Sequence, residues 1–189
     1  MPLIKDNRIV EDSWVTLADD ESVPQGAWPV VGLERWRAER AALMDLGVPL
    51  GIRLNSDQPP RLIADELEHF ALVALAFPKF TDGRAYSYAR LLRERYGYAG
   101  ELRAVGAVLL DQALFMVRCG FDAFEVPDVI SAEAWRAALR RISVRYQPAA
   151  DGRSPIRPAR PARRPRSAVV PLGQAVTAPA DACAAVWAY

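Results

Sequence analysis

The chain has 189 residues, 51% of them hydrophobic and 25% charged, and its formal net charge is +1. This length and composition are typical of one globular domain with a sizeable core. No apolar run reaches membrane-spanning length, and the first residues contain no apolar stretch of signal-peptide type. These observations argue against membrane association and export, and they predict a cytoplasmic protein.

Few residue types suited to metal or redox chemistry are present. The two cysteines, Cys119 and Cys183, are far apart, so we expect a reduced protein without a disulfide framework. The single histidine, His69, argues against histidine-based zinc sites and a Ser-His-Asp triad. The motifs G-x-G-x-x-G, G-x-x-x-x-G-K-[ST] and C-x-x-C do not occur. We therefore predict no metal site, and the sequence leaves the identity of any cofactor unknown.

Apolar runs alternate with helical patterns from residue 26 to residue 147. In chain order we expect strand 28–33, helix 34–46, strand 51–54, helix 61–69, strand 72–77, helix 85–96, strand 102–105, helix 107–119, strand 123–126 and helix 132–142. This alternation predicts a single α/β domain with a mostly parallel sheet of about five strands flanked by helices. An open sheet and a partial β/α barrel remain as alternatives.

The segments on either side of this domain have a different character. We expect residues 1–25 to form an extended or hairpin-like N-terminal arm. Residues 148–189 are rich in Pro, Ala and Arg, and they are expected to be a disordered tail. The tail carries six arginines and two aspartates but lacks interleaved aromatic residues, so codon bias explains it better than nucleic-acid binding does.

Polar residues are densest just after the expected strand 72–77. This group comprises Lys79, Asp82, Gly83, Arg84, Tyr86 and Ser87. In a parallel α/β sheet, ligands bind beyond the carboxyl ends of the strands. The next strand contributes Arg103, and the helix after it carries Asp111 and Gln112. We therefore expect all of these residues to meet at one rim of the sheet.

The cations of this group predict a site for a small anion. Lys79, Arg84 and Arg103 would make the rim positive, and free N–H groups at the start of the helix would add to it. Sulfate, sulfite, phosphate or a carboxylate fits such a site. If the protein is an enzyme, which the sequence leaves open, Asp82 or Asp111 is the candidate catalytic acid or base.

Each of these residues also has a purely structural explanation. Asp82 can be a helix cap, with Arg84 paired to Asp82 or to Glu125. Tyr86 fits core or rim packing, and Asp111 fits a solvated stripe or an ion pair with Arg118. A non-catalytic interaction module therefore stays an alternative to a ligand-binding site.

Long stretches of the chain resemble a known family. They are F-P-K-F-T-D-G-R-A-Y-S-Y-A-R-L-L-R-E-R-Y-G-Y, G-E-L-R-A-V-G, D-Q-A-L-F-M-V-R-C-G-F-D-A-F-E-V and P-L-G-I-R-L-N-S-D-Q. Over about residues 8–150 the chain resembles the bacterial domain-of-unknown-function family 934. Members of that family usually end soon after the Y-Q-P at 146–148, so the resemblance implies no function for the tail.

The resemblance implies a role in assimilatory sulfite reduction, because members are commonly labelled oxidoreductases from their gene neighbours. It implies sulfite reductase or other sulfate-assimilation enzymes as partners, so an accessory protein or an oxidoreductase of that process is one expected function. A stand-alone enzyme acting on a small anionic metabolite is one alternative, and a non-catalytic interaction module is another. The sequence does not predict the oligomeric state.

Overall fold

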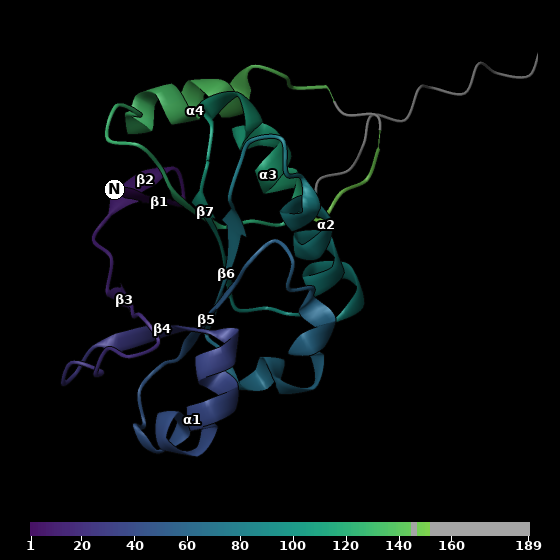
Figure 1. Ribbon diagram of the computed structural model, residues 1–189. Helices are drawn as coiled ribbons and strands as arrows, with labels where there is room; N and C mark the ends of the chain where they lie inside the picture. The colour runs from purple at the N-terminus through teal and green to yellow at the C-terminus, as the bar shows by residue number, and fades with distance from the viewer. Residues whose placement is uncertain (145–146, 152–189) are drawn as a thin grey trace, which may run out of the picture. The chain divides into compact units, whose positions relative to one another are not determined.

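Eight strands form one mixed sheet in the computed structural model, which describes residues 1–144 and 147–151 (Figure 1). The strands are β1 (Leu3–Lys5), β2 (Arg8–Val10), β3 (Trp14–Thr16), β4 (Trp28–Gly32), β5 (Gly51–Leu54), β6 (Leu72–Phe77), β7 (Glu101–Gly106) and β8 (Ala123–Glu125). Their order across the sheet is β2-β1-β8-β7-β6-β5-β4-β3. Neighbours from β3 to β8 are parallel, whereas β1 is antiparallel to both β8 and β2.

The sheet is larger and more mixed than the expected sheet of about five strands. The five expected strands are β4 to β8, and they are parallel to one another. The additional β1, β2 and β3 have three residues each, which is too short for an alternating pattern to stand out in the sequence. Asp6 and Asn7 have φ angles of 51° and 62°, the sign that a tight turn between antiparallel strands requires. This turn folds β2 back on β1 and makes the sheet mixed.

The sheet is curled but open. From β3 to β8 the strands follow one another in chain order, as in a β/α barrel and unlike a doubly wound sheet, where the order reverses. The edge strands β2 and β3 are not paired with each other. Only residues 11–13 connect them, so Val10 and Trp14 lie at most about 14 Å apart even if this link is fully extended. Three residues thus span the open side of the sheet.

Helices follow most of the parallel strands. The α-helices in the described residues are α1 (Leu33–Asp45), α2 (Arg84–Arg90), α3 (Ala113–Cys119) and α4 (Ala132–Arg140), and the π-helical turn η3 (Leu91–Arg95) continues α2. The helix expected over 61–69 is instead two 3₁₀ helices, η1 (Pro60–Leu62) and η2 (Ala64–His69), because Ile63 has a non-helical φ of −127°. The helix expected over 107–119 begins later, with the 3₁₀ helix η4 (Leu110–Gln112), because Leu109 is extended.

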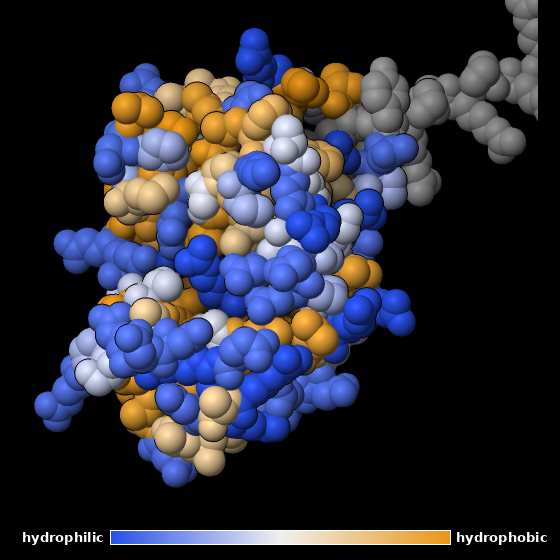
Figure 2. Space-filling model, in the orientation of Figure 1, coloured by the Kyte–Doolittle hydropathy of each residue, from blue (hydrophilic) through white to orange (hydrophobic). Residues whose placement is uncertain are grey.

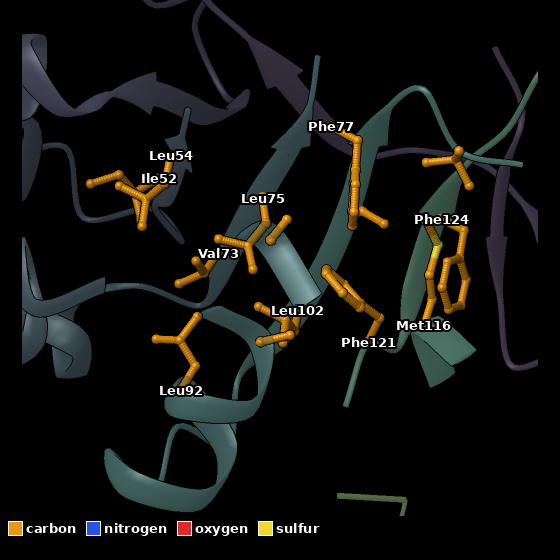
Figure 3. Packing of buried hydrophobic residues seen from close by; sticks show 14 of the residues in the cluster. Ile52, Leu54, Val73, Leu75, Phe77, Leu92, Leu102, Met116, Phe121 and Phe124 are labelled. Carbon is orange, nitrogen blue, oxygen red and sulfur yellow. The ribbon is translucent and has the colours of Figure 1, made fainter. Parts of the chain in front are cut away.

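The main core lies between the helices and one face of the sheet. Figure 3 shows Val73, Leu75 and Phe77 of β6 projecting toward the same side as Leu92 and Phe121, and all five are at most 3% exposed. The opposite side we call the inner face. It carries a smaller apolar cluster of Val30, Leu72, Ala74, Ala76 and Val105. Because both faces are covered, every residue of β6 is buried, which explains its continuous apolar sequence.

Two sequence expectations concern features beyond this sheet. No helix among residues 1–144 and 147–151 has the length and apolar character needed to cross a membrane. Residues 148–189 are the tail expected to be disordered. From residue 152 onward, this tail lies outside the described residues. The cytoplasmic location stays a prediction.

Candidate functional site

A pocket of about 600 Å³ opens where β5, β6 and β7 end. Parallel strands finish at one edge of a sheet, and ligands of α/β proteins bind beyond that edge. The lining residues are Arg53, Asn55, Ser56 and Asp57 from β5 and its following loop, Ala76, Phe77 and Pro78 from β6, and Gly106 and Ala107 from β7. We call this the rim pocket.

Arg53 supplies the positive charge of the rim pocket. It is the third residue of β5 and its register partner on β6 is Ala74, whose small side chain leaves the inner face uncrowded there. The side chain is exposed, and it makes no hydrogen bond or ion pair with any residue of the described part of the chain. Arg53 is therefore available to a ligand. The side chain of Asn55 is likewise without a hydrogen bond to the described residues.

Arg103, the cation expected at the rim, lies on the inner face and is neutralised there. Its register neighbours are the small residues Ala74 and Ala123. The guanidinium donates to both carboxylate oxygens of Asp12, at 2.7 and 3.0 Å, and to Glu101 at 2.9 Å. Only 3% of the Arg103 side chain is exposed. The structure thus separates Arg103 from the rim pocket, which it does not line.

The carboxylates around Arg103 tie the open side of the sheet together. Asp12 belongs to the three-residue link between β2 and β3, and it also accepts the backbone N–H of Trp14 at 3.1 Å. Glu101 binds Lys5 of β1 at 2.7 Å, and Glu125 of β8 lies 3.5 Å from Arg103. The network therefore connects the link, β1, β7 and β8, which is a structural role.

Arg84 and Asp82 form an ion pair that contacts Ser56 of the rim pocket. The Arg84 guanidinium donates to the two oxygens of Asp82 at 3.0 and 2.7 Å and to Ser56 Oγ at 2.9 Å. The hydrogen bonds from Arg84 and then from Ser56 lower the pKa of Asp82 below its usual range. Asp82 is therefore ionised at neutral pH and cannot donate a proton. The pair also fastens the loop after β6 to the loop after β5.

Two glycines at the rim differ in whether a side chain could replace them. Gly83, expected to supply a turn, has φ −89°, and a Cβ there would meet Tyr86 at an ordinary 3.5 Å. Gly106 has φ +92°, and a Cβ there would lie 2.5 Å from the Phe77 carbonyl oxygen. The next residue, Ala107, donates its N–H to that same oxygen at 2.8 Å. Only glycine at 106 therefore lets β7 close the pocket wall against β6.

Tyr86 and Gln112 are paired with each other. The Tyr86 hydroxyl donates to Gln112 Oε1 at 2.7 Å, and its ring packs against Phe77 and Phe115 with centroid distances of 5.0 and 4.7 Å. Burial raises the pKa of Tyr86 to about 12, with smaller contributions from Cys119 and Asp111. The phenol is thus neutral, and it fastens α2 to η4.

The other expected site residues are scattered. Lys79 is exposed in the loop after β6, and its side chain has no hydrogen bond or ion pair with the described residues. Ser87 lies in a separate hollow with Arg90 and Glu94. Asp111 borders another pocket, beside α4. Of the expected residues, the structure joins Asp82 to Arg84 and Tyr86 to Gln112, and it brings the first pair to the border of the rim pocket.

Sequence reasoning missed the residues that line the β5 side of the pocket. Arg53, Asn55, Ser56 and Asp57 lie within the run R-L-N-S-D, at and just beyond the end of an expected strand. The rule that placed Lys79 and Asp82 at the rim applies equally to this strand end. The end of the expected strand 51–54 was therefore a sequence signal that could have identified these four residues.

The described residues contain neither a cluster suited to a metal ion nor an activated thiol. Among them, no group of three or more His, Cys, Asp or Glu side chains is placed to hold a metal ion. Cys119 is 3% exposed, and burial raises the pKa of its thiol to about 11. Its thiolate, the reactive form, is therefore scarce at neutral pH.

The fold and the pocket define an α/β protein with consecutive parallel strands and a ligand-type pocket at their carboxyl ends. The chain belongs to the family described as bacterial protein of unknown function (DUF934), whose sequence profile matches residues 51–157. That range contains every residue of the rim pocket. No curated protein matches the chain. The predicted family is thus confirmed, and its association with sulfite reduction stays a prediction.

Proposed function

We propose that the rim pocket binds a small anion through Arg53. The observation that supports this is that the arginines near the rim differ in whether a carboxylate neutralises them. Arg84 and Arg103 are engaged with carboxylates, whereas Arg53 lines the pocket without a partner in the described part of the chain. An arginine of this kind can form two parallel hydrogen bonds to a carboxylate or an oxyanion.

The other polar groups of the pocket set the size and charge of the ligand. The Asn55 amide offers hydrogen bonds beside Arg53, whereas the Ser56 hydroxyl is engaged with Arg84 and Asp82. Asp57 adds one negative charge, which disfavours ligands that carry several. A singly or doubly charged ion such as sulfite, sulfate, phosphate or a short carboxylate fits this arrangement. Lys79, exposed in the neighbouring loop, adds positive potential at the entrance.

We further propose that the protein is an accessory component or an oxidoreductase of assimilatory sulfite reduction. Sulfite is then the first anion to test, and sulfite reductase the first partner. In the alternative of a stand-alone enzyme acting on a small anion, Asp57 is the carboxylate that faces the ligand, because Asp82 is held ionised by Arg84. A non-catalytic interaction module is favoured by the internal pairing of Asp82, Arg84, Tyr86 and Gln112.

Ligand binding is tested by thermal unfolding and calorimetry with sulfite, sulfate, phosphate and acetate at constant ionic strength. A ligand at about 100 times its Kd adds about 2.7 kcal/mol to the free energy of unfolding, which raises Tm by several degrees. We expect Arg53→Met to abolish this rise. The control Arg136→Met removes an exposed arginine of α4 and should leave it intact. Equal responses of both variants would contradict the anion site.

The pathway role needs separate measurements. An absorbance spectrum of concentrated protein detects a co-purifying flavin or other redox cofactor. Assays of sulfite reductase with and without the protein, combined with a pull-down, test the accessory role. Absence of binding and of any rate change removes that role but leaves the anion site standing.

A further inference from the structure

A second pocket, of about 730 Å³, lies beside α4. The loops after β7 and β8 form one wall, and α4 forms the other. Four of its lining residues, Ala134, Ala137, Ala138 and Arg141, follow the spacing i, i+3, i+4, i+7. That spacing places them on one side of the helix. We call the pocket and this side of the helix the α4 surface.

The rest of α4 holds this surface in place. Trp135, on another side of the helix, is fully buried and packs on Phe124 at a centroid distance of 4.6 Å. Ser131 Oγ accepts the backbone N–H of Ala134 at 3.1 Å and caps the start of the helix. The helix is thus anchored from behind, while Ala137 remains exposed.

Large apolar side chains border the α4 surface. Val129, in the loop after β8, is 91% exposed, and Leu109, after β7, is 38% exposed. Ile142, just beyond α4, is 57% exposed. Figure 2 shows apolar side chains, in orange, gathered over α4 in the upper part of the view. Removing such area from water is favourable in proportion to its size, and contiguous exposed apolar area marks interaction sites.

The charges of the α4 surface suit a copy of itself. The pocket is lined by one acid, Asp111, and one base, Arg141. Neither side chain makes a hydrogen bond or ion pair with the residues described. In a twofold dimer any contact between two different residues occurs twice, so a patch with one free acid and one free base can satisfy both charges against a second copy.

We propose that the α4 surface is the interface of a twofold homodimer. The α4 helices of two copies pack against each other through their alanines, whose small side chains allow helix axes to approach to about 8 Å. Asp111 pairs with Arg141 of the second copy, and Val129 and Leu109 are buried at the border. The rim pocket is a separate pocket and does not depend on this interface.

Sedimentation velocity of the full chain over a range of micromolar concentrations tests the proposal. The wild type is expected to be a dimer. Ala137→Glu, which keeps helix propensity but places a charge in the interface, is expected to be monomeric with unchanged circular dichroism. Ala42→Glu, an equivalent change at an exposed position of α1, is the control and should remain dimeric. A monomeric wild type, or an Ala137→Glu variant that still dimerises, overturns the proposal.

A charge exchange tests the predicted ion pairs. Asp111→Arg and Arg141→Asp each place like charges opposite each other, and each is expected to raise the dimer Kd by about tenfold or more. The double variant restores opposite charges and is expected to recover most of the affinity. Single variants without effect, or a double variant no better than the singles, overturn this arrangement of the two copies.

Discussion

Arg53 and Arg103 occupy equivalent positions in the sheet but have opposite surroundings. Both lie on the inner face in one register row, with Ala74 between them. Arg103 is bound by carboxylates and is almost fully buried, whereas Arg53 faces the rim pocket without a partner among the described residues. The difference arises two residues earlier on each strand, in the register row that contains Leu72 of β6. In that row β7 carries Glu101, whereas β5 carries Gly51.

The comparison shows that strand position alone does not identify a binding residue. Residues two apart on a strand share one face, so a carboxylate two positions from an arginine is placed to neutralise it. Glu101 and the distant Asp12 make Arg103 a structural residue. On β5 the position equivalent to Glu101 is Gly51, which has no carboxylate, so Arg53 stays free for a ligand.

The largest expected effect comes from Arg103→Met. The substitution keeps an unbranched side chain but leaves Asp12 and Glu125 without their cation, and it leaves Glu101 with Lys5 as its only cation. We expect the free energy of unfolding to fall by about 3 kcal/mol, near the lower end for a broken buried pair because the carboxylates are partly exposed. Urea denaturation measures it, as a change in midpoint at constant slope. Arg53→Met should cost less than about 0.5 kcal/mol, and equal losses would end the distinction between the two arginines.

Next in size is Gly106→Ala, at the wall of the rim pocket. The φ of +92° and the 2.5 Å approach to the Phe77 carbonyl make any side chain costly here. We expect a loss of about 2 kcal/mol and weaker anion binding, since the wall must move. The matched change Gly83→Ala, in the neighbouring loop with φ −89°, should alter stability by less than about 1 kcal/mol. Similar effects of both changes in urea denaturation would contradict this account of the wall.

Asp12→Asn tests the link across the open side of the sheet. The amide keeps one acceptor for Arg103 or for the Trp14 N–H but loses the charge. We expect a loss of about 1–2 kcal/mol in urea denaturation. Asp20→Asn, at an exposed acid of the following loop, serves as the control and should be near neutral. A neutral Asp12→Asn would mean that residues 11–13 merely connect the edges without closing them.

The smallest expected effect concerns Asp82 and depends on pH. The pKa of Asp82 is lower in the folded chain than its ordinary value near 3.8, owing first to the hydrogen bond from Arg84. Its contribution is therefore present above about pH 4 and is lost as the pH falls below that value. Wild type and Asp82→Asn should differ in unfolding midpoint at neutral pH and converge in acid. A difference that stays constant with pH would mean that the charge of Asp82 does not matter.

The longer parallel strands could be predicted from the sequence, and the sheet edges could not. Strand 72–77 is a buried apolar run that ends before Pro78, and strand 51–54 is apolar except for Arg53 and begins at Gly51; the structure has both at those bounds. The strands of the first sixteen residues are too short to show a period. Their places depend on a pairing with β8, which no local pattern reveals.

The candidate site was also predictable only in part. The strand-end rule pointed to the loop after β6, and the ion pair between Asp82 and Arg84 was one of the two structural accounts the sequence offered for Arg84. The neutralisation of Arg103 could not be predicted, because its main partner, Asp12, lies 91 residues away and reaches it only through the curl of the sheet. Which arginine is free therefore depends on tertiary structure.

The pairing of β1 with β8 has a consequence for how the protein is made. Ile4 lies opposite Phe124, about 120 positions later in the chain. Ribosomes add roughly 5–20 residues per second, so the first strands wait on the order of ten seconds for their partner. During that time Ile4, which is fully buried in the finished sheet, lacks the partner strand that it pairs with there. Synthesis of the last strand is the event that lets the first ones join the fold.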